Sequence, residues 1–318
     1  MTERLYLNDA YLYEFNATII GVKTGESGIE IILDKTVFYP ETGGQLYDKG
    51  LLDGHLVTAA FEIETDEIVH IVSDWTAPIG ATVKGVIDER RRQDNRSKHT
   101  GQHILSRAFL DTAGGETVSS RLGEVESTIE LSVNYLDDAA IARAETMAND
   151  IVLDNLPINI AYYDREELKK LPIRKIPERD GKFRIVRIGD FDYTACGGTH
   201  CRNTGEVGLI KIIGREKLRG HLRVIFLSGH LAFDDYNEKH QVITRLAEEF
   251  TCHFRDLPTA IEKMTEQNQF LRRELNNHNA LTLYNELSAK IDAAPKFGEV
   301  IIFAAEYDNS DLKILKET

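Results

Sequence analysis

Two pairs of side chains have the spacing that metal ligands need. His99 and His103 lie in a segment with helical periodicity, so both imidazoles fall on one face, one turn apart. Cys196 and His200 have the same spacing across Gly197 and Gly198, which favours a tight turn over a regular helix. Three imidazoles and one thiolate suit Zn²⁺. The sequence therefore predicts one zinc ion per chain.

The ligand set fits two kinds of zinc site. A structural site is closed, whereas a catalytic site keeps one position for water or substrate. No glutamate lies between His99 and His103, unlike the His-Glu-x-x-His helix in which that glutamate is the general base, so a peptidase is disfavoured. Asp190 and Asp192 precede the cysteine and are candidates to orient a liganding imidazole, with plain surface turns as the alternative.

Two further segments have residues that could contact a substrate. The motif Phe38–Gln45 contains a proline, Gly43 and Gly44, which predict a tight, exposed turn. The amide of Gln45 could then bind a polar group or a 3′-terminal nucleotide, and an ordinary β-turn is the alternative. Ser119 and Ser120 follow a Gly-Gly loop and could line a small pocket, with an ordinary loop as the alternative.

The charge distribution is uneven along the chain. The net charge of −14 argues against a general nucleic-acid coat protein. Residues 84–103, 165–187 and 202–223 nevertheless carry +3, +5 and +4, and they flank the His and Cys clusters. These islands could hold a polyanion locally, or they could simply cover solvated faces. Arg215 and Arg219, in an expected loop between two strands, are candidate phosphate contacts.

The composition is that of a globular chain in a reducing compartment. The 318 residues contain three cysteines, which excludes a disulfide scaffold. No stretch approaches the ~18 apolar residues of a membrane span, and the first residues lack the apolar core of a secretory signal. We therefore expect a cytoplasmic protein without a membrane partner.

The elements that must position these residues predict an α+β fold. Short β-branched runs and an Asp-Gly hairpin over residues 1–88 predict a small N-terminal β-barrel. Residues 89–230 mix helices at 88–112 and 137–153 with strands, and form the expected zinc-binding α+β core. Residues 231–292 predict a long helix or short coiled coil. Residues 293–318, with a strand at 299–304 and a helix start at 310–313, are expected to begin a truncated, incomplete α/β domain.

The motifs together resemble a known family. Phe38–Gln45, His99–Leu105, and Cys196–His200 followed by Thr204–Gly208 occur in the order and approximate spacing of the editing domain of alanyl-tRNA synthetase. Since no aminoacylation domain precedes them, the sequence most resembles the freestanding alanyl-tRNA editing proteins of the AlaX type, in their long form. The resemblance is strong over residues 1–230 and weaker over 231–318.

The resemblance implies a function for most of these residues. It implies an aminoacyl-tRNA deacylase that hydrolyses mischarged tRNA(Ala), chiefly Ser-tRNA(Ala) and also Gly-tRNA(Ala), with residues 89–230 as the editing domain. The metal ligands of the family fall on His99, His103, Cys196 and His200. The Gly-Gly-Gln motif falls on Gly43, Gly44 and Gln45, near the substrate end of the site, and the segment that meets the serine hydroxyl falls near Ser119 and Ser120.

Three functional alternatives remain open from the residues. The first is the editing hydrolase, and the second is a zinc-stabilised tRNA-binding module without hydrolysis. The third is a zinc hydrolase of a small nucleotide or ester, which would not need the basic islands or the phosphate contacts at Arg215 and Arg219. The C-terminal helical segment could pair between two chains as a homodimer or fold back on itself.

Overall fold

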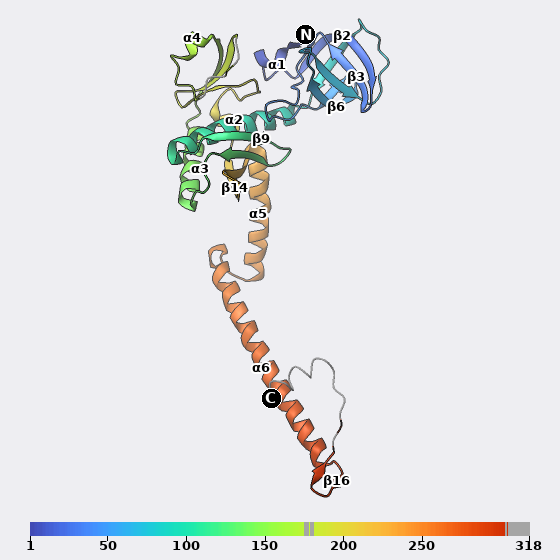
Figure 1. The fold of residues 1–318 in the computed structure, drawn as a ribbon, viewed down its shortest axis with the longest axis vertical. Coiled ribbons are helices and arrows are strands. Elements are labelled where there is room, and N and C mark those ends of the chain that lie inside the picture. The colour runs from blue at the N-terminus through green and yellow to red at the C-terminus, as the bar shows by residue number, and fades with distance from the viewer. Residues whose placement is uncertain (175–177, 179–180, 303, 305–318) are drawn as a thin grey trace. The chain divides into compact units, whose positions relative to one another are not determined.

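The computed structural model describes residues 1–174, 178, 181–302 and 304 (Figure 1). The chain divides into two compact units, Met1–Asn237 and Glu238–Thr318. The four-part division expected from the sequence stays a prediction.

The strands of the first unit are β1 (Glu3–Arg4), β2 (Glu14–Gly25), β3 (Gly28–Leu33), β4 (Lys35–Thr36), β5 (Gly50–Leu52), β6 (His55–Glu62), β7 (Ile68–Val72), β8 (Thr82–Ile87), β9 (Thr117–Leu122), β10 (Ser127–Leu131), β11 (Ile158–Tyr163), β12 (Phe183–Ile188), β13 (Asp192–Ala195), β14 (Ile210–Lys217) and β15 (Leu222–Ser228).

The predicted N-terminal barrel is confirmed. Its strands close in the order β2-β3-β7-β6-β5-β8, and each neighbouring pair is antiparallel. The predicted Asp-Gly hairpin joins β5 to β6, with Asp53 and Gly54 both at positive φ, as a turn of this type requires. Alternate side chains of the strands fill the barrel, among them Ile31, Leu33 and Val57.

Helix α2 (Glu89–Ala113) connects the barrel to the α+β core (Figure 1). The Asp88 side chain caps its N-terminus by accepting from the Arg91 amide, and Gly114 ends it in the left-handed conformation. Its C-terminal half packs Leu105 and Phe109 into a core shared with helix α3 (Asp138–Leu153) and the sheet β14-β15-β10-β9. The predicted helices at 88–112 and 137–153 are therefore confirmed.

A third sheet, β11-β12-β13, precedes the cysteine motif. Between β11 and β12 the chain forms the short helix α4 (Arg165–Leu168), whose N-terminus is closed by a capping box between Asp164 and Glu167. Strand β13 ends at Ala195, so the sheet delivers Cys196 directly from its last strand. The remaining short elements of this unit are α1 (Leu5–Asn8) and the 3₁₀ turn at Thr204–Val207.

The second unit contains the C-terminal part of one helix and all of another. Helix α5 (Gly229–Glu249) leads into it, and α6 (Leu257–Asp292) is followed by a short hairpin of β16 (Lys296–Phe297) and β17 (Val300–Ile301). The predicted long C-terminal helix is confirmed as α6, but residues 231–292 are not one continuous helix, because α5 ends at Glu249 and α6 begins at Leu257. The strand expected at 299–304 is shorter, and the helix start expected at 310–313 lies outside the described residues. None of the described helices combines the length and apolar character needed to cross a membrane.

Candidate metal centre

The four predicted ligands meet at one place in the first unit. One donor atom each from His99, His103, Cys196 and His200 lies within 4.8 Å of the other three. The Nε2 atoms of His99 and His200 are 3.2 and 3.3 Å from Cys196 Sγ. The three imidazole rings have centroids 4.5–5.2 Å apart. The structure therefore brings together two pairs that lie about a hundred residues apart in the sequence.

The two pairs are held by different kinds of backbone. Helix α2 places His99 and His103 on one face, as their spacing predicts. The segment from Cys196 to His200 is irregular, as the glycines predict. A Cβ built on Gly198 would lie 2.0 Å from His99 Cε1, so only glycine lets the turn approach the imidazole. Buried Arg184 holds this turn by donating from Nη1 to the carbonyls of Cys196 (2.7 Å) and Gly198 (3.1 Å).

Two of the three imidazoles have a hydrogen-bonding neighbour at Nδ1. His99 Nδ1 is 2.7 Å from Gln45 Oε1, and His200 Nδ1 is 3.3 Å from Thr100 Oγ1. The Nδ1 atom of His103 is buried and has no hydrogen-bond partner among the described residues, and its nearest carboxylate is Asp192 at 3.9 Å. Metal-bound histidines usually have such outer partners.

The sequence identified some of these outer residues and missed others. Asp192 was one of the two aspartates considered for this role and is fully buried, whereas Asp190 is an exposed partner of Arg187. Thr100 and Arg184 were not foreseen. The position of Thr100, next to a ligand on the same helix, was the one available signal, and nothing in the sequence pointed to Arg184.

Burial sets the protonation of the cluster. Burial, together with the nearby Arg184 guanidinium, lowers the pKa of His99 to about 4, and burial lowers the pKa of His103 and His200 well below the usual value. Neutral imidazoles are the form that binds metal. Burial raises the pKa of the Cys196 thiol, partly offset by the Gly198 amide that donates to its sulfur. Three neutral imidazoles, one thiol and an orphaned ring nitrogen with a carboxylate nearby fit a resident Zn²⁺.

The cluster lies at the edge of a cleft with a volume of about 900 Å³. Gly43, Ser119 and Ser120, all predicted to contact substrate, line it together with His99, His103 and Cys196. Cys196 is half-buried while the three imidazoles are buried. The remaining lining residues are mainly polar: Gln102, Ser106, Leu110, Glu116, Thr117, Val118, Arg174, Glu178, Thr194 and Ala195.

The motif around Gln45 differs in part from the sequence expectation. The tip, Glu41–Gly44, is exposed as predicted, whereas Gln45 is fully buried and both ends of its amide are hydrogen-bonded. Gly44 has φ +81°, and a Cβ there would lie 2.6 Å from the Ser120 carbonyl oxygen. The glycine is therefore required by close packing on β9.

The two candidate phosphate contacts lie in different settings. Arg215 is part of strand β14, not of the connecting loop where the sequence placed it. Its guanidinium donates to the Leu136 carbonyl (3.1 Å) and pairs with Asp138 (2.6 Å). Arg219 lies in the turn between β14 and β15, and its side chain is exposed.

The fold and the cluster define a barrel-plus-α+β protein in which three histidines and one cysteine could hold a metal ion. Comparisons with known proteins place it more closely. Residues 183–228 match the family described as the threonyl and alanyl tRNA synthetase second additional domain. Residues 10–91 match the family described as tRNA synthetases class II (A).

Full-length relatives extend the match. The chain is 36% identical over 247 residues to alanyl-tRNA editing protein AlaX-L of Pyrococcus horikoshii, covering 75% of this chain and 61% of the relative. It is 34% identical over 236 residues to AlaX-M of Methanosarcina mazei, covering 69% of this chain and 92% of that protein. It is 30% identical over 329 residues to the alanine–tRNA ligase of Archaeoglobus fulgidus, covering 99% of this chain but 35% of the ligase. The chain belongs to the alanyl-tRNA editing protein family.

Proposed function

We propose that this protein is a trans-editing hydrolase that deacylates mischarged tRNA(Ala), chiefly Ser-tRNA(Ala) and also Gly-tRNA(Ala). The observation that carries the proposal is the three-histidine, one-cysteine cluster at the edge of a large polar cleft. The names of the relatives, alanyl-tRNA editing proteins AlaX-L and AlaX-M, point to the same reaction. Translation-related chemistry would place the protein in the cytoplasm.

The proposed ligands of one Zn²⁺ per chain are His99, His103, Cys196 and His200. When bound, zinc supplies a Lewis acid that can lower the pKa of water or polarise an ester carbonyl. The chain itself orients the ligands: Gln45 and Thr100 hold the Nδ1 sides of two imidazoles, and Arg184 fixes the carbonyls of the cysteine turn. Cys196, half-buried, faces the cleft from which a substrate would approach.

Recognition of the serine hydroxyl is assigned to the polar wall of the cleft. Ser119 and Ser120 line it near Gly43, and a hydrogen-bonded row links Gln102 to Ser106 (2.8 Å) and Ser106 to Thr117 (2.7 Å). A pocket built to hydrogen-bond a substrate hydroxyl discriminates strongly against the analogue that lacks it. Such a wall would favour the seryl ester over the alanyl ester. An apolar pocket that attaches alanine to tRNA cannot make this distinction strongly, because it rejects an added hydroxyl only weakly.

The tRNA(Ala) acceptor end is the proposed partner, and Arg219 is the better candidate of the two arginines for contacting it. Its exposed side chain is available to a phosphate, whereas Arg215 already pairs with Asp138 and the Leu136 carbonyl. Charge reversal at Arg219 should weaken tRNA binding and reduce its salt dependence. An enzyme for a small nucleotide or ester would hardly respond. Pairing of two chains through α6 stays a prediction.

The decisive experiment measures release of the amino acid from Ser-, Gly- and Ala-charged tRNA(Ala), with and without a chelator. We expect serine release by the zinc-loaded protein, and loss of release after chelation and in Cys196→Ala with little loss of tRNA binding. Cys252→Ala, which removes a half-buried thiol far from the site in sequence, is the matched control and should keep full activity.

Two results would argue against the proposal. Deacylation by a metal-free Cys196→Ala protein would show that the metal has no role in the reaction. Zinc binding and salt-sensitive tRNA binding by wild-type protein that releases no amino acid would instead favour the zinc-stabilised tRNA-binding module.

A further inference from the structure

The amide of Gln45 is a bridge between three parts of the metal centre. Gln45 is fully buried. Its Oε1 atom is 2.7 Å from His99 Nδ1 and 3.1 Å from the Thr199 backbone nitrogen, and its Nε2 donates to Thr199 Oγ1 at 3.0 Å. The amide therefore contacts a ligand on α2 and the turn between the other two ligands, Cys196 and His200.

These contacts fix both the orientation of the amide and the tautomer of His99. The Thr199 backbone N–H can only donate, so the atom that it meets must be the amide oxygen. The same oxygen faces His99 Nδ1, which must therefore carry the ring proton. Deprotonated Nε2, which lies 3.2 Å from Cys196 Sγ, is then the atom available to the metal.

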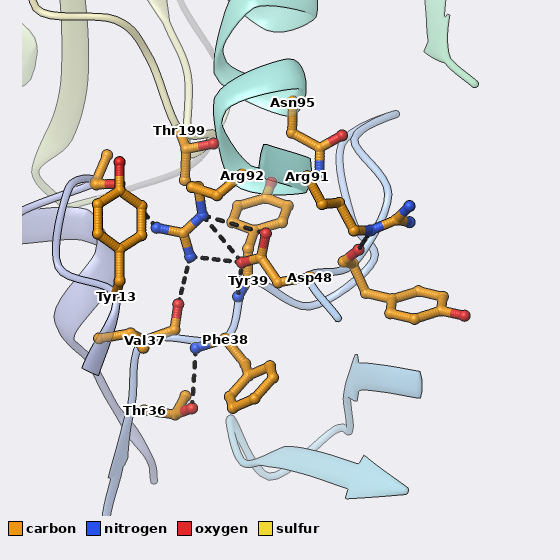
Figure 2. Close-up of polar contacts among 12 residues, drawn as sticks. Tyr13, Thr36, Val37, Phe38, Tyr39, Asp48, Arg91, Arg92, Asn95 and Thr199 are labelled. Carbon is orange, nitrogen blue, oxygen red and sulfur yellow. Dashed lines mark hydrogen bonds and ion pairs between the residues drawn. The ribbon is translucent and has the colours of Figure 1, made fainter. Parts of the chain in front are cut away.

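The segment that carries Gln45 is anchored on both sides. Leu122 of β9 donates its amide to the Gly44 carbonyl at 2.8 Å. Asp48 accepts from the Tyr39 amide at 2.7 Å and forms a fully buried ion pair with Arg92 of α2. Figure 2 shows this pair, with the Arg92 guanidinium also donating to the Val37 carbonyl. Gln45 is thus presented to His99 by a segment fastened to the same helix.

We propose that Gln45 is a positioning residue of the metal centre: it selects the His99 tautomer that binds through Nε2 and ties the barrel to the cysteine turn, and it does not contact substrate. Among the described residues that line the cleft, Gly43 is present and Gln45 is not. The inference rests on the proposed function in one respect only, namely that the four residues bind zinc. It concerns metal affinity and requires no particular substrate.

The test measures zinc affinity by chelator competition, without tRNA. Gln45→Leu keeps the approximate size of the side chain but removes the acceptor, and we expect zinc to bind about 10–100-fold more weakly. Gln45→Glu keeps an acceptor for His99 and for the Thr199 amide, while the Thr199 hydroxyl can turn to donate to the carboxylate, so affinity should recover to within a few-fold of wild type. Gln93→Leu makes the same change at an exposed position of α2 and should leave affinity unchanged.

A second measurement needs no variant and covers the case in which Gln45→Leu does not fold. Nitrogen chemical shifts of the histidines in zinc-loaded wild-type protein should show His99 with a protonated Nδ1 and a metal-bound Nε2. The opposite tautomer would overturn the proposal.

Kinetics separate this inference from the proposed function. Unchanged zinc affinity in Gln45→Leu, with a raised KM for deacylation alone, would make Gln45 a substrate contact and overturn the inference. Absence of deacylation by wild type would overturn the proposed function, and the zinc and tautomer results would still decide the role of Gln45.

Discussion

The buried ion pair between Asp48 and Arg92 allows a quantitative test of how the barrel is joined to α2. Both side chains are fully buried. Arg92 Nε lies 3.1 and 3.2 Å from the two Asp48 carboxylate oxygens, and the guanidinium also donates to the Val37 carbonyl (Figure 2). It donates to the Ala10 carbonyl as well. Asp48→Ala removes the charge partner and leaves a buried cation with carbonyls alone.

The expected cost follows from these contacts. Removing one partner of a buried ion pair destabilises a protein by about 3–5 kcal/mol. The Tyr39 amide also loses its acceptor, which favours the upper half of that range. This is a large share of the roughly 5–15 kcal/mol that stabilises an ordinary domain. In Asp48→Leu combined with Arg92→Met, no charge stays buried, so most of the loss should be recovered, although the Val37 and Ala10 carbonyls remain without their donor.

Urea unfolding followed by tryptophan fluorescence measures the effect. Trp75 is the single tryptophan and packs against the barrel core, so it reports on the unit that contains the ion pair. The control is Asp111→Ala, which breaks the partly exposed Arg107–Asp111 pair on the same helix and should cost under about 0.5 kcal/mol. A free-energy change for Asp48→Ala no larger than that of the control would refute the reasoning.

Two further predictions concern the turn and the barrel. Gly198→Ala would place a methyl group 2.0 Å from His99 Cε1 and should weaken zinc binding by more than roughly tenfold, an effect as large as the loss of a residue that orients a ligand. The control Gly197→Ala, whose new Cβ meets no atom within 4 Å, should bind zinc normally. Equal zinc affinities of the two variants in chelator competition would contradict the geometry. Burial lowers the pKa of His70 to about 4, against about 6.5 in the unfolded chain. The unfolded chain therefore binds the proton more readily, and protonation of His70 reduces the free energy of unfolding as the pH falls from about 6.5 toward 4. The full loss is about 3 kcal/mol, and none of it occurs above about pH 6.5. Urea titrations at about pH 7 and pH 4 should show a smaller pH-dependent loss in His70→Gln than in wild type, and parallel losses would rule out this contribution.

Much of the fold was accessible from the sequence because its signals are local. The Asp53-Gly54 turn and the alternating strands predict a barrel from residues close together in the chain. The apolar positions of α2, such as Leu105 and Phe109, follow its helical period. Pairing of distant strands is less accessible: β10 pairs with β15, whose partner residues are about a hundred positions away, and no local pattern encodes that register.

The proposed metal ligands and the residues that would orient them differ in predictability for a chemical reason. His and Cys at fixed spacing are rare enough to indicate coordination chemistry before any fold is known. Glutamine, threonine and arginine are common on surfaces, so Gln45, Thr100 and Arg184 carry no comparable signal. Gln45 was predicted to face a substrate because its flanking glycines indicate an exposed turn, yet the glycine next to it is needed for packing on β9, and this packing buries the amide against His99. The motif therefore predicts the exposed turn correctly, but it predicts a substrate contact at Gln45 where the structure favours a positioning role. Measuring the zinc affinity of Gln45 variants distinguishes these two roles.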